Sequence, residues 1–138
     1  MMTFNYIFTN FIIEENLDID LDKLKIFCYN QRKVNLGREI SNYGGWQSKD
    51  LLITEEILPL MQSVDTILKN IHRYVGITEN IKLDNMWINI NQKSNFNTSH
   101  IHAGSLFSGV FYVSTPKNCG KIVFKNNNSF LWFMVYTP

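Results

Sequence analysis

The chain is organised around the stretch Asn89-Ile-Asn-Gln-Lys-Ser-Asn-Phe-Asn-Thr-Ser-His100-Ile-His102-Ala-Gly-Ser-Leu-Phe-Ser108-Gly-Val-Phe-Tyr112-Val113. An apolar segment enters an asparagine-rich loop, the loop carries two histidines one residue apart, and a second apolar segment with a tyrosine follows. Residues two apart in an extended segment point to the same face, so the spacing predicts that His100 and His102 can share one metal ion. Taken alone, this spacing more often marks structural or surface histidines, at odds of roughly three to one.

The composition is that of an ordinary globular domain. Of the 138 residues, 45% are hydrophobic and 18% are charged, and 13 basic against 12 acidic side chains leave a formal net charge of +1. This balance gives no electrostatic signature of a nucleic-acid partner or of an anionic membrane surface. We predict one domain over residues 1–138, with a helical part at 1–80 and a partial β-barrel at 81–138.

The sequence shows no signal of export or of membrane insertion. Its apolar runs are interrupted well before about 18 residues, and no basic region precedes an apolar one at the N-terminus. Cys28 and Cys119 lie far apart and match no metal-binding or redox spacing. We therefore predict a cytoplasmic protein with two reduced thiols, with an incidental disulfide as the alternative.

A strand and a helix are predicted near the N-terminus. Residues 5–13 are rich in aromatic and β-branched side chains, which favours an early strand. Asp18 and Asp20 then suit the first turn of an amphipathic helix, and basic residues near position 33 suit its last turn. This helix is expected to pack on the outside of a sheet.

A second helix is predicted at roughly 58–75. Pro59 fits its first turn, Gly76 can cap its end, and apolar residues recur at helical spacing. His72 in this helix is assigned no metal role, because a helix-end histidine is explained by the helix dipole. Between the two helices, Gly44-Gly-Trp46 predicts a turn that is anchored by the tryptophan.

From residue 81 onward the apolar period changes to two, which predicts strands. Met86, Ile88 and Ile90 alternate with Trp87, Asn89 and Asn91, so this strand has an apolar face and a face that carries amides. Further strands are predicted at 108–115 and 121–125, joined by a hairpin loop at 116–120. The amide face needs either solvent or hydrogen-bonding partners, depending on whether it lies outside or inside a barrel.

Several motifs follow one another in a fixed order: Gly44-Gly-Trp-Gln-Ser48, Trp87-x-Asn89, Asn97, His100-x-His102, Ser108-Gly-Val-Phe-Tyr-Val113, Pro116, Gly120 and Phe124. In this order and spacing the sequence resembles the 2-oxoglutarate and Fe(II)-dependent oxygenases of the prolyl-hydroxylase-like, double-stranded β-helix type. The resemblance covers more than half of the chain. The segment that follows the histidine pair is its most specific part.

The resemblance implies an α+β fold in which an incomplete double-stranded β-helix, a jelly-roll or cupin-like barrel, is flanked by two N-terminal helices. It also implies Fe(II) and 2-oxoglutarate as cofactors, and a hydroxylase-type dioxygenase reaction that releases succinate. By matching positions, His100 and His102 correspond to iron ligands, and Asn89 and Tyr112 to residues that bind the cosubstrate. A packed core aromatic is the alternative role for Tyr112.

Two departures from the family pattern bear on activity. His102 stands where the family usually has an aspartate. After His102 the sequence has no His, Asp, Glu or Arg, so later strands cannot supply a third ligand of these types or an arginine for the cosubstrate, and lysines are the remaining cations. We therefore predict weak and unselective metal binding, assign no catalytic side chain, and predict no turnover by this chain alone.

Two other interpretations compete with the oxygenase. One is a non-catalytic β-barrel with a binding or structural function, in which the histidines are structural. The other is a cupin-like metal enzyme, ranked last because Ser105-Leu-Phe107 stands where a glutamate is needed. The resemblance fades after Phe124, as if final barrel strands were missing or replaced, and an open sheet edge there predicts self-association. The substrate, a small molecule or a peptide, is not identified by the sequence.

Overall fold

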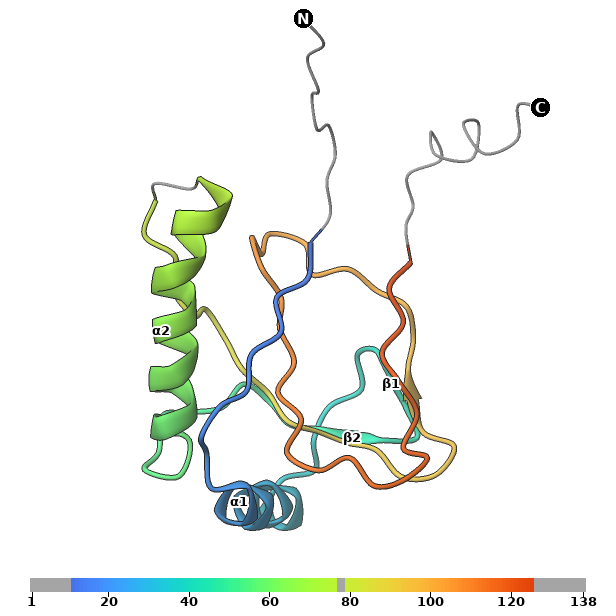
Figure 1. The fold of residues 1–138 in the computed structure, drawn as a ribbon. Coiled ribbons are helices and arrows are strands. Elements are labelled where there is room, and N and C mark those ends of the chain that lie inside the picture. Colours follow the sequence, from blue (N-terminus) through green and yellow to red (C-terminus); the bar gives the residue numbers. More distant parts are fainter. Residues whose placement is uncertain (1–10, 77–78, 126–138) are drawn as a thin grey trace, which may run out of the picture.

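The computed structural model describes residues 11–76 and 79–125. Along the chain these residues form α1 (Leu21–Val34), β1 (Asn42–Tyr43), β2 (Trp46–Gln47), α2 (Leu58–Val75), β3 (Asn89–Ile90) and β4 (Phe96–Asn97). The fold is therefore α+β, with two helices and short antiparallel strands. Figure 1 shows α2 along one side of the molecule and α1 at its lower end, with the strands and long loops beside them.

Helix α1 begins at a cap that the sequence supplies. The side chain of Asp20 accepts a hydrogen bond from the Lys23 backbone N–H at 2.9 Å. This bond satisfies one of the free N–H groups of the first turn, while basic residues in the last turn complement the helix dipole. The helix buries Leu24 and Phe27. The predicted first helix is confirmed.

Helix α2 has the predicted bounds. Gly76 follows it with φ of +68°, the left-handed conformation in which a glycine ends a helix at little cost. Leu60 and Ile71 are buried on its inner face. Just before the helix, Ile57 is 2% exposed. The row of apolar residues predicted for this helix therefore faces the rest of the molecule.

One core cluster joins the two helices to the segments that follow. Leu24, Phe27, Ile57 and Leu60 form its buried centre. Other apolar side chains pack against this centre from the part of the chain that carries the predicted strands: Met86, Ile88, Phe111 and Val113. Alternate residues of two extended segments thus face the core, and the residues between them face away from it.

The strands form two short antiparallel pairs that join distant parts of the chain. β1 pairs with β4, and β2 pairs with β3, so residues 42–47 lie along residues 89–97. Trp46 is anchored as predicted, because its Nε1–H donates to the Asn35 carbonyl oxygen at 3.1 Å. The Gly44-Gly-Trp46 segment is more than a turn, since it also lies in the pairing that supports the histidine loop.

The predicted barrel is not present among the described residues. Residues 108–115 and 121–125 are not strands, and the strand predicted from residue 81 is reduced to Asn89–Ile90. The turn between the two predicted strands does form, with a hydrogen bond from the Cys119 N–H to the Pro116 carbonyl oxygen at 3.0 Å. An extended segment becomes a strand when a neighbour pairs with its N–H and C=O groups, and no described segment does so here.

The predicted N-terminal strand also needs correction. Residues 5–10 lie outside the described residues, and Phe11–Ile13 are not in a strand. Instead, the segment that leads to α1 runs beside the segment after the histidines (Figure 1), and the Phe11 and Phe107 rings are 6.1 Å apart. These two segments contact through side chains without strand pairing, so the aromatic and β-branched composition over-predicted a strand at residues 11–13.

The structure also bears on the two cysteines and on membrane insertion. Cys28 and Cys119 are both free thiols, as predicted, and Cys28 is half-buried whereas Cys119 is exposed. Neither described helix combines the length and the apolar character that a membrane span requires.

We expect a thiol reagent such as iodoacetamide to modify Cys119 well before Cys28. Burial raises the pKa of the Cys28 thiol, so less reactive thiolate is present at a given pH, and the half-buried sulfur is also less accessible. Intact-mass spectrometry over time at pH 8 measures both rates, with the Cys119→Ser variant isolating Cys28. Equal rates at the two sites would contradict the half-buried position of Cys28.

Candidate functional site

The chain that leads to the histidines is held in place by residues from the first half of the sequence. The Thr98 backbone N–H donates to the Ser41 carbonyl oxygen at 2.7 Å. The amide of Asn97 donates to the Ser41 hydroxyl oxygen at 3.1 Å, and Asn97 itself pairs with Asn42 across the β1–β4 ladder. The start of the histidine loop is therefore positioned both by main-chain pairing and by the Asn97 side chain.

The two imidazole rings lie against each other. Their centroids are 4.9 Å apart, with 71° between the ring planes. His100 Nδ1 lies 2.7 Å from the Thr98 carbonyl oxygen. Because a carbonyl oxygen can only accept, Nδ1 carries the hydrogen, and Nε2 of the neutral ring keeps a free electron pair. This tautomer leaves Nε2 able to bind a metal while a backbone acceptor orients the ring.

The ring separation fits shared metal coordination. Two imidazoles bound to one ion through bonds of about 2.1 Å, at an angle of roughly 90–110°, have centroids about 4.6–5.3 Å apart. The observed 4.9 Å lies in this range. It is also an ordinary separation for an edge-to-face aromatic pair, so the distance is compatible with both roles.

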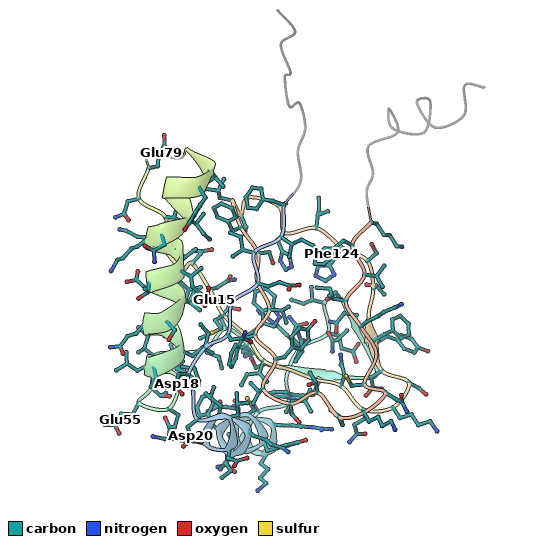
Figure 2. All side chains as sticks on the ribbon, viewed as in Figure 1. Glu15, Asp18, Asp20, Glu55, Glu79 and Phe124 are labelled. Carbon is teal, nitrogen blue, oxygen red and sulfur yellow. The ribbon has the colours of Figure 1, made fainter. Side chains whose placement is uncertain are left out.

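A third protein ligand is not found in the part of the chain that the structure describes. Residues 11–76 and 79–125 contain no group of three His, Cys, Asp or Glu side chains placed to hold one ion. Figure 2 shows Asp18 and Asp20 near α1, Glu55 before α2 and Glu79 beyond its end, so these carboxylates surround the helices. The described site is thus two imidazoles, which is a partial coordination shell.

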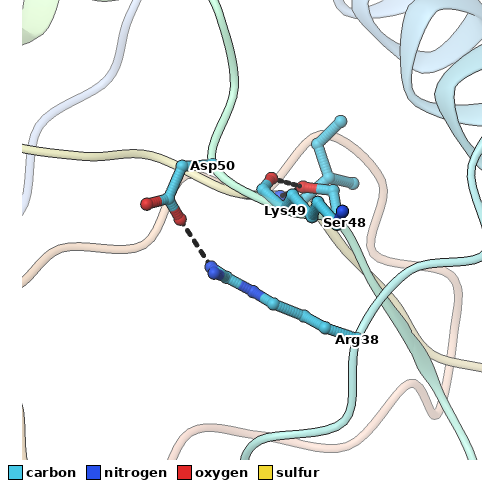
Figure 3. A network of polar contacts seen from close by, with 5 residues as sticks. Arg38, Ser48, Lys49 and Asp50 are labelled. Atoms are coloured by element: carbon cyan, nitrogen blue, oxygen red, sulfur yellow. Dashed lines mark hydrogen bonds and ion pairs between the residues drawn. The ribbon is translucent and has the colours of Figure 1, made fainter.

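An aromatic and a cationic side chain extend the site on one side. The Trp87 ring lies 5.6 Å from the His102 ring, measured between centroids. The guanidinium carbon of Arg38 lies 5.9 Å from the centroid of the same Trp87 ring. Arg38 Nη2 in turn donates to Asp50 Oδ1 at 2.6 Å (Figure 3). Trp87 therefore connects the histidine pair to an arginine that is held by an ion pair.

Strand register places this arginine on the same face as the predicted amide. Arg38 bridges to Gln47, and Gln47 pairs with Asn89, so their three side chains share one face. Trp87 lies two residues before Asn89 and is on that face as well. Gln47 is 3% exposed, and both its Oε1 and the Arg38 Nε are buried without a hydrogen-bonding partner among the described residues.

The sequence analysis gave Arg38 no role, because it looked for a cation after the histidines. The usable signal was the Gly44-Gly-Trp-Gln-Ser48 motif, because the sequence analysis had already grouped it with the segment that carries the histidines. The Arg38 backbone N–H donates a hydrogen bond to the Gln47 backbone carbonyl oxygen at 2.8 Å, which links Arg38 to that motif. No sequence pattern close to residue 38 indicates that Arg38 pairs with Gln47.

Asn89 and Tyr112 both lie on the side away from the core. Asn89 is exposed in β3 and alternates with core-facing Ile88. Tyr112 is 52% exposed and stands between Phe111 and Val113, which pack on the core. Tyr112 is therefore not a packed core aromatic in this structure. A cosubstrate-binding role for either residue stays a prediction.

Comparison with known proteins supports the family resemblance. Residues 85–138 match the model of a family described as "Putative 2OG-Fe(II) oxygenase". The C-terminal part of the chain thus matches the 2OG-Fe(II) oxygenases. The matched part contains Asn89, both histidines and Tyr112, whereas Arg38 and Gln47 precede it. No curated protein and no solved structure matches the chain.

Proposed function

We propose that this chain is an Fe(II)- and 2-oxoglutarate-dependent dioxygenase domain of hydroxylase type, with an incomplete set of protein ligands. His100 and His102 are the metal ligands in this proposal. Asn89 and Tyr112 are the residues that bind 2-oxoglutarate in this proposal. The family match over residues 85–138, which contain both histidines, carries the proposal, and the 4.9 Å between ring centroids is compatible with one shared ion.

The side chains have distinct tasks in the proposed site. The Thr98 carbonyl oxygen holds the Nδ1–H of His100 and so orients its ring. Trp87 covers one side of His102 and limits its rotation. When bound, Fe(II) with 2-oxoglutarate supplies the oxidising chemistry that converts the cosubstrate to succinate and hydroxylates a substrate. The amide of Asn89 and the hydroxyl of Tyr112 offer hydrogen bonds to the cosubstrate.

The proposed fold, location and partners follow the family resemblance. We take the chain as one oxygenase-like domain, and the short antiparallel pairs as part of a jelly-roll arrangement. Free Cys28 and Cys119 support a cytoplasmic location. The substrate is a small molecule or a peptide, and neither nucleic acid nor a membrane is proposed as a partner. Self-association stays a prediction, supported by exposed apolar side chains at Ile122, Val123 and Phe124.

Anaerobic calorimetric titration with Mn(II) in place of Fe(II) tests the proposal. We expect weak binding of the metal alone, because two neutral imidazoles leave most of the shell to water. Adding 2-oxoglutarate should tighten metal binding by about tenfold or more, since a chelating ligand and the metal favour each other reciprocally. His100→Ala and His102→Ala should each abolish both effects.

A third histidine provides the matched control. His72→Ala removes one imidazole from α2 and should leave metal binding unchanged. Metal binding that is equal in all three variants would disprove the site. Succinate release with Fe(II) and ascorbate should be negligible for this chain alone. Robust release that is lost in His100→Ala would show that a third ligand completes the site.

A non-catalytic binding or structural protein is the second candidate. Two observations favour it: the described residues hold no third ligand, and the histidine rings are at an ordinary edge-to-face distance. On this interpretation the His100–Thr98 contact stabilises the loop. Replacing both histidines would then lower the thermal stability without changing the response to Mn(II).

A further inference from the structure

A groove of about 390 Å³ lies between α1 and the connection that leads to α2. One wall is a stripe of α1 that runs from Lys23 to Gln31, and the other wall is made by Thr54 and Glu56. None of the residues that line the groove belongs to the histidine site. Its volume is within the range of small-molecule sites in proteins, so we consider which ligand its side chains would bind.

Both walls of the groove are held by the buried core. Phe27 lines the groove and is 7% exposed, and it belongs to the same core cluster as Ile57, which directly follows Glu56. The Thr54 carbonyl oxygen accepts a hydrogen bond from the Leu58 N–H at 3.0 Å, which fixes the connection at the start of α2. The groove is therefore preformed, which lowers the ordering cost of binding a ligand.

Opposite charges face the groove from its two walls. Lys23 is on α1, and Glu56 is on the connection. The pKa of Glu56 lies below its ordinary value, first because of the Thr54 hydroxyl and the Glu56 backbone N–H, and also because of the positive charge of Lys23. Lys23 is thus close enough to act on Glu56, yet the two side chains form no ion pair among the described residues. Each charge is therefore available to a ligand.

Uncharged groups complete the groove. Ile26 is 63% exposed and offers an apolar surface next to buried Phe27. Thr54 Oγ1 is buried near the Glu56 carboxylate and forms no hydrogen bond of good geometry with a described residue. A buried oxygen of this kind is stabilised by a donor that a ligand brings. Asn30 lies seven residues after Lys23, about 10 Å along the helix, and lines the far end with an amide.

We propose that this groove binds a free amino acid with an apolar side chain, in its zwitterionic form. The carboxylate of the ligand pairs with Lys23, and its ammonium group donates to the Glu56 carboxylate and to Thr54 Oγ1. Its apolar side chain lies on Ile26 and Phe27. A zwitterion pairs with both charges at once, whereas a simple anion or cation pairs with one of them and is repelled by the other. The site is independent of the proposed function.

Leucine and three relatives separate the groups on the ligand. L-Leucine has both charges and an apolar side chain, L-leucinamide lacks the carboxylate, N-acetyl-L-leucine lacks the ammonium group, and glycine lacks the side chain. Titrations at about pH 6.5, where the amino group is protonated, are followed by two-dimensional amide NMR spectra, which give the affinity and the residues that respond.

The proteins are the wild type, Lys23→Gln and Glu56→Gln. The matched controls are Lys25→Gln and Glu55→Gln, which remove the same charges from exposed positions that do not line the groove. Figure 2 shows Glu55 on the side of the connection away from α1. Circular dichroism checks that all variants are folded.

We expect leucine to bind weakly and to shift the amide signals of residues 23–31 and 54–56, with glycine severalfold weaker. Lys23→Gln should weaken the binding of leucine and N-acetylleucine by about fivefold, the effect of losing one partly exposed charge pair, and should not weaken leucinamide. Glu56→Gln should weaken leucine and leucinamide by a similar factor and should not weaken N-acetylleucine. The two control variants should bind like the wild type.

Three results would overturn the proposal. The first is the absence of shifts at residues 23–31 and 54–56 up to the solubility limit of leucine. The second is equal affinity of leucine, leucinamide and N-acetylleucine, which would mean that apolar contact alone holds the ligand. The third is an equal loss in Lys23→Gln and in the control variants, which would mean that the lost charge acts at long range rather than in the groove. The titrations contain no metal, so their outcome is separate from that of the proposed iron site.

Discussion

Ile57→Ala should lower the free energy of unfolding by about 3 kcal/mol. Ile57 is 2% exposed and lies in the buried centre of the core, with Leu24, Phe27 and Leu60. Truncating such a side chain removes its transfer free energy and leaves a cavity that the surroundings fill only in part. The described core is small, so one residue carries a large share of its stability.

Urea unfolding followed by circular dichroism measures this loss. Ile53→Ala is the matched control, because Ile53 lies in the same connection before α2 and is 68% exposed. The control should change the unfolding free energy by less than about 0.5 kcal/mol. Similar losses at the two positions would contradict the packing of residue 57 between the helices.

Gly37→Ala should have the second large effect, and it links the fold to the site. Gly37 has φ of +79°, a region that costs an L-residue roughly 1–2 kcal/mol. A Cβ at this position would also lie 2.7 Å from the Gln47 carbonyl oxygen and 2.5 Å from Trp46 Nε1. That carbonyl accepts the Arg38 N–H, so relief of the overlap displaces the bridge that positions Arg38. We expect a total loss of about 2–3 kcal/mol.

Two other glycines separate the causes of this loss. Gly104 has φ of +84° with nothing near a built Cβ, so Gly104→Ala reports the backbone cost alone, about 1 kcal/mol. Gly109 has no positive φ and no close neighbour, so Gly109→Ala should be nearly neutral. If Gly37→Ala and Gly104→Ala cost the same, the close approach of residues 46 and 47 would be wrong.

The helices were predictable because their signals are local. Asp20 caps the first turn of α1, and Gly76 ends α2. Each of these signals, like the apolar stripe of α2, acts on residues a few positions away in its own helix. The same holds for the spacing of His100 and His102, whose rings lie together. The strands at 108–115 and 121–125 were over-predicted, because alternation marks which side of a segment is apolar and says nothing about a hydrogen-bonded neighbour.

The two helices and the histidine pair follow from the sequence, because each depends on residue types at short spacing. The resemblance to the 2OG-Fe(II) oxygenases also follows from the sequence, because it depends on the order of motifs and needs no contact between them. The tertiary structure alone placed Arg38 and Gln47 on the same face as Trp87 and Asn89, and brought the Trp87 ring beside His102. It also limited the strands to two short pairs. The shared face and the short strand pairs have the same physical reason. Strand pairing joins backbone groups from distant parts of the chain, and the partner of a segment is chosen by the fold as a whole rather than by that segment's own residues.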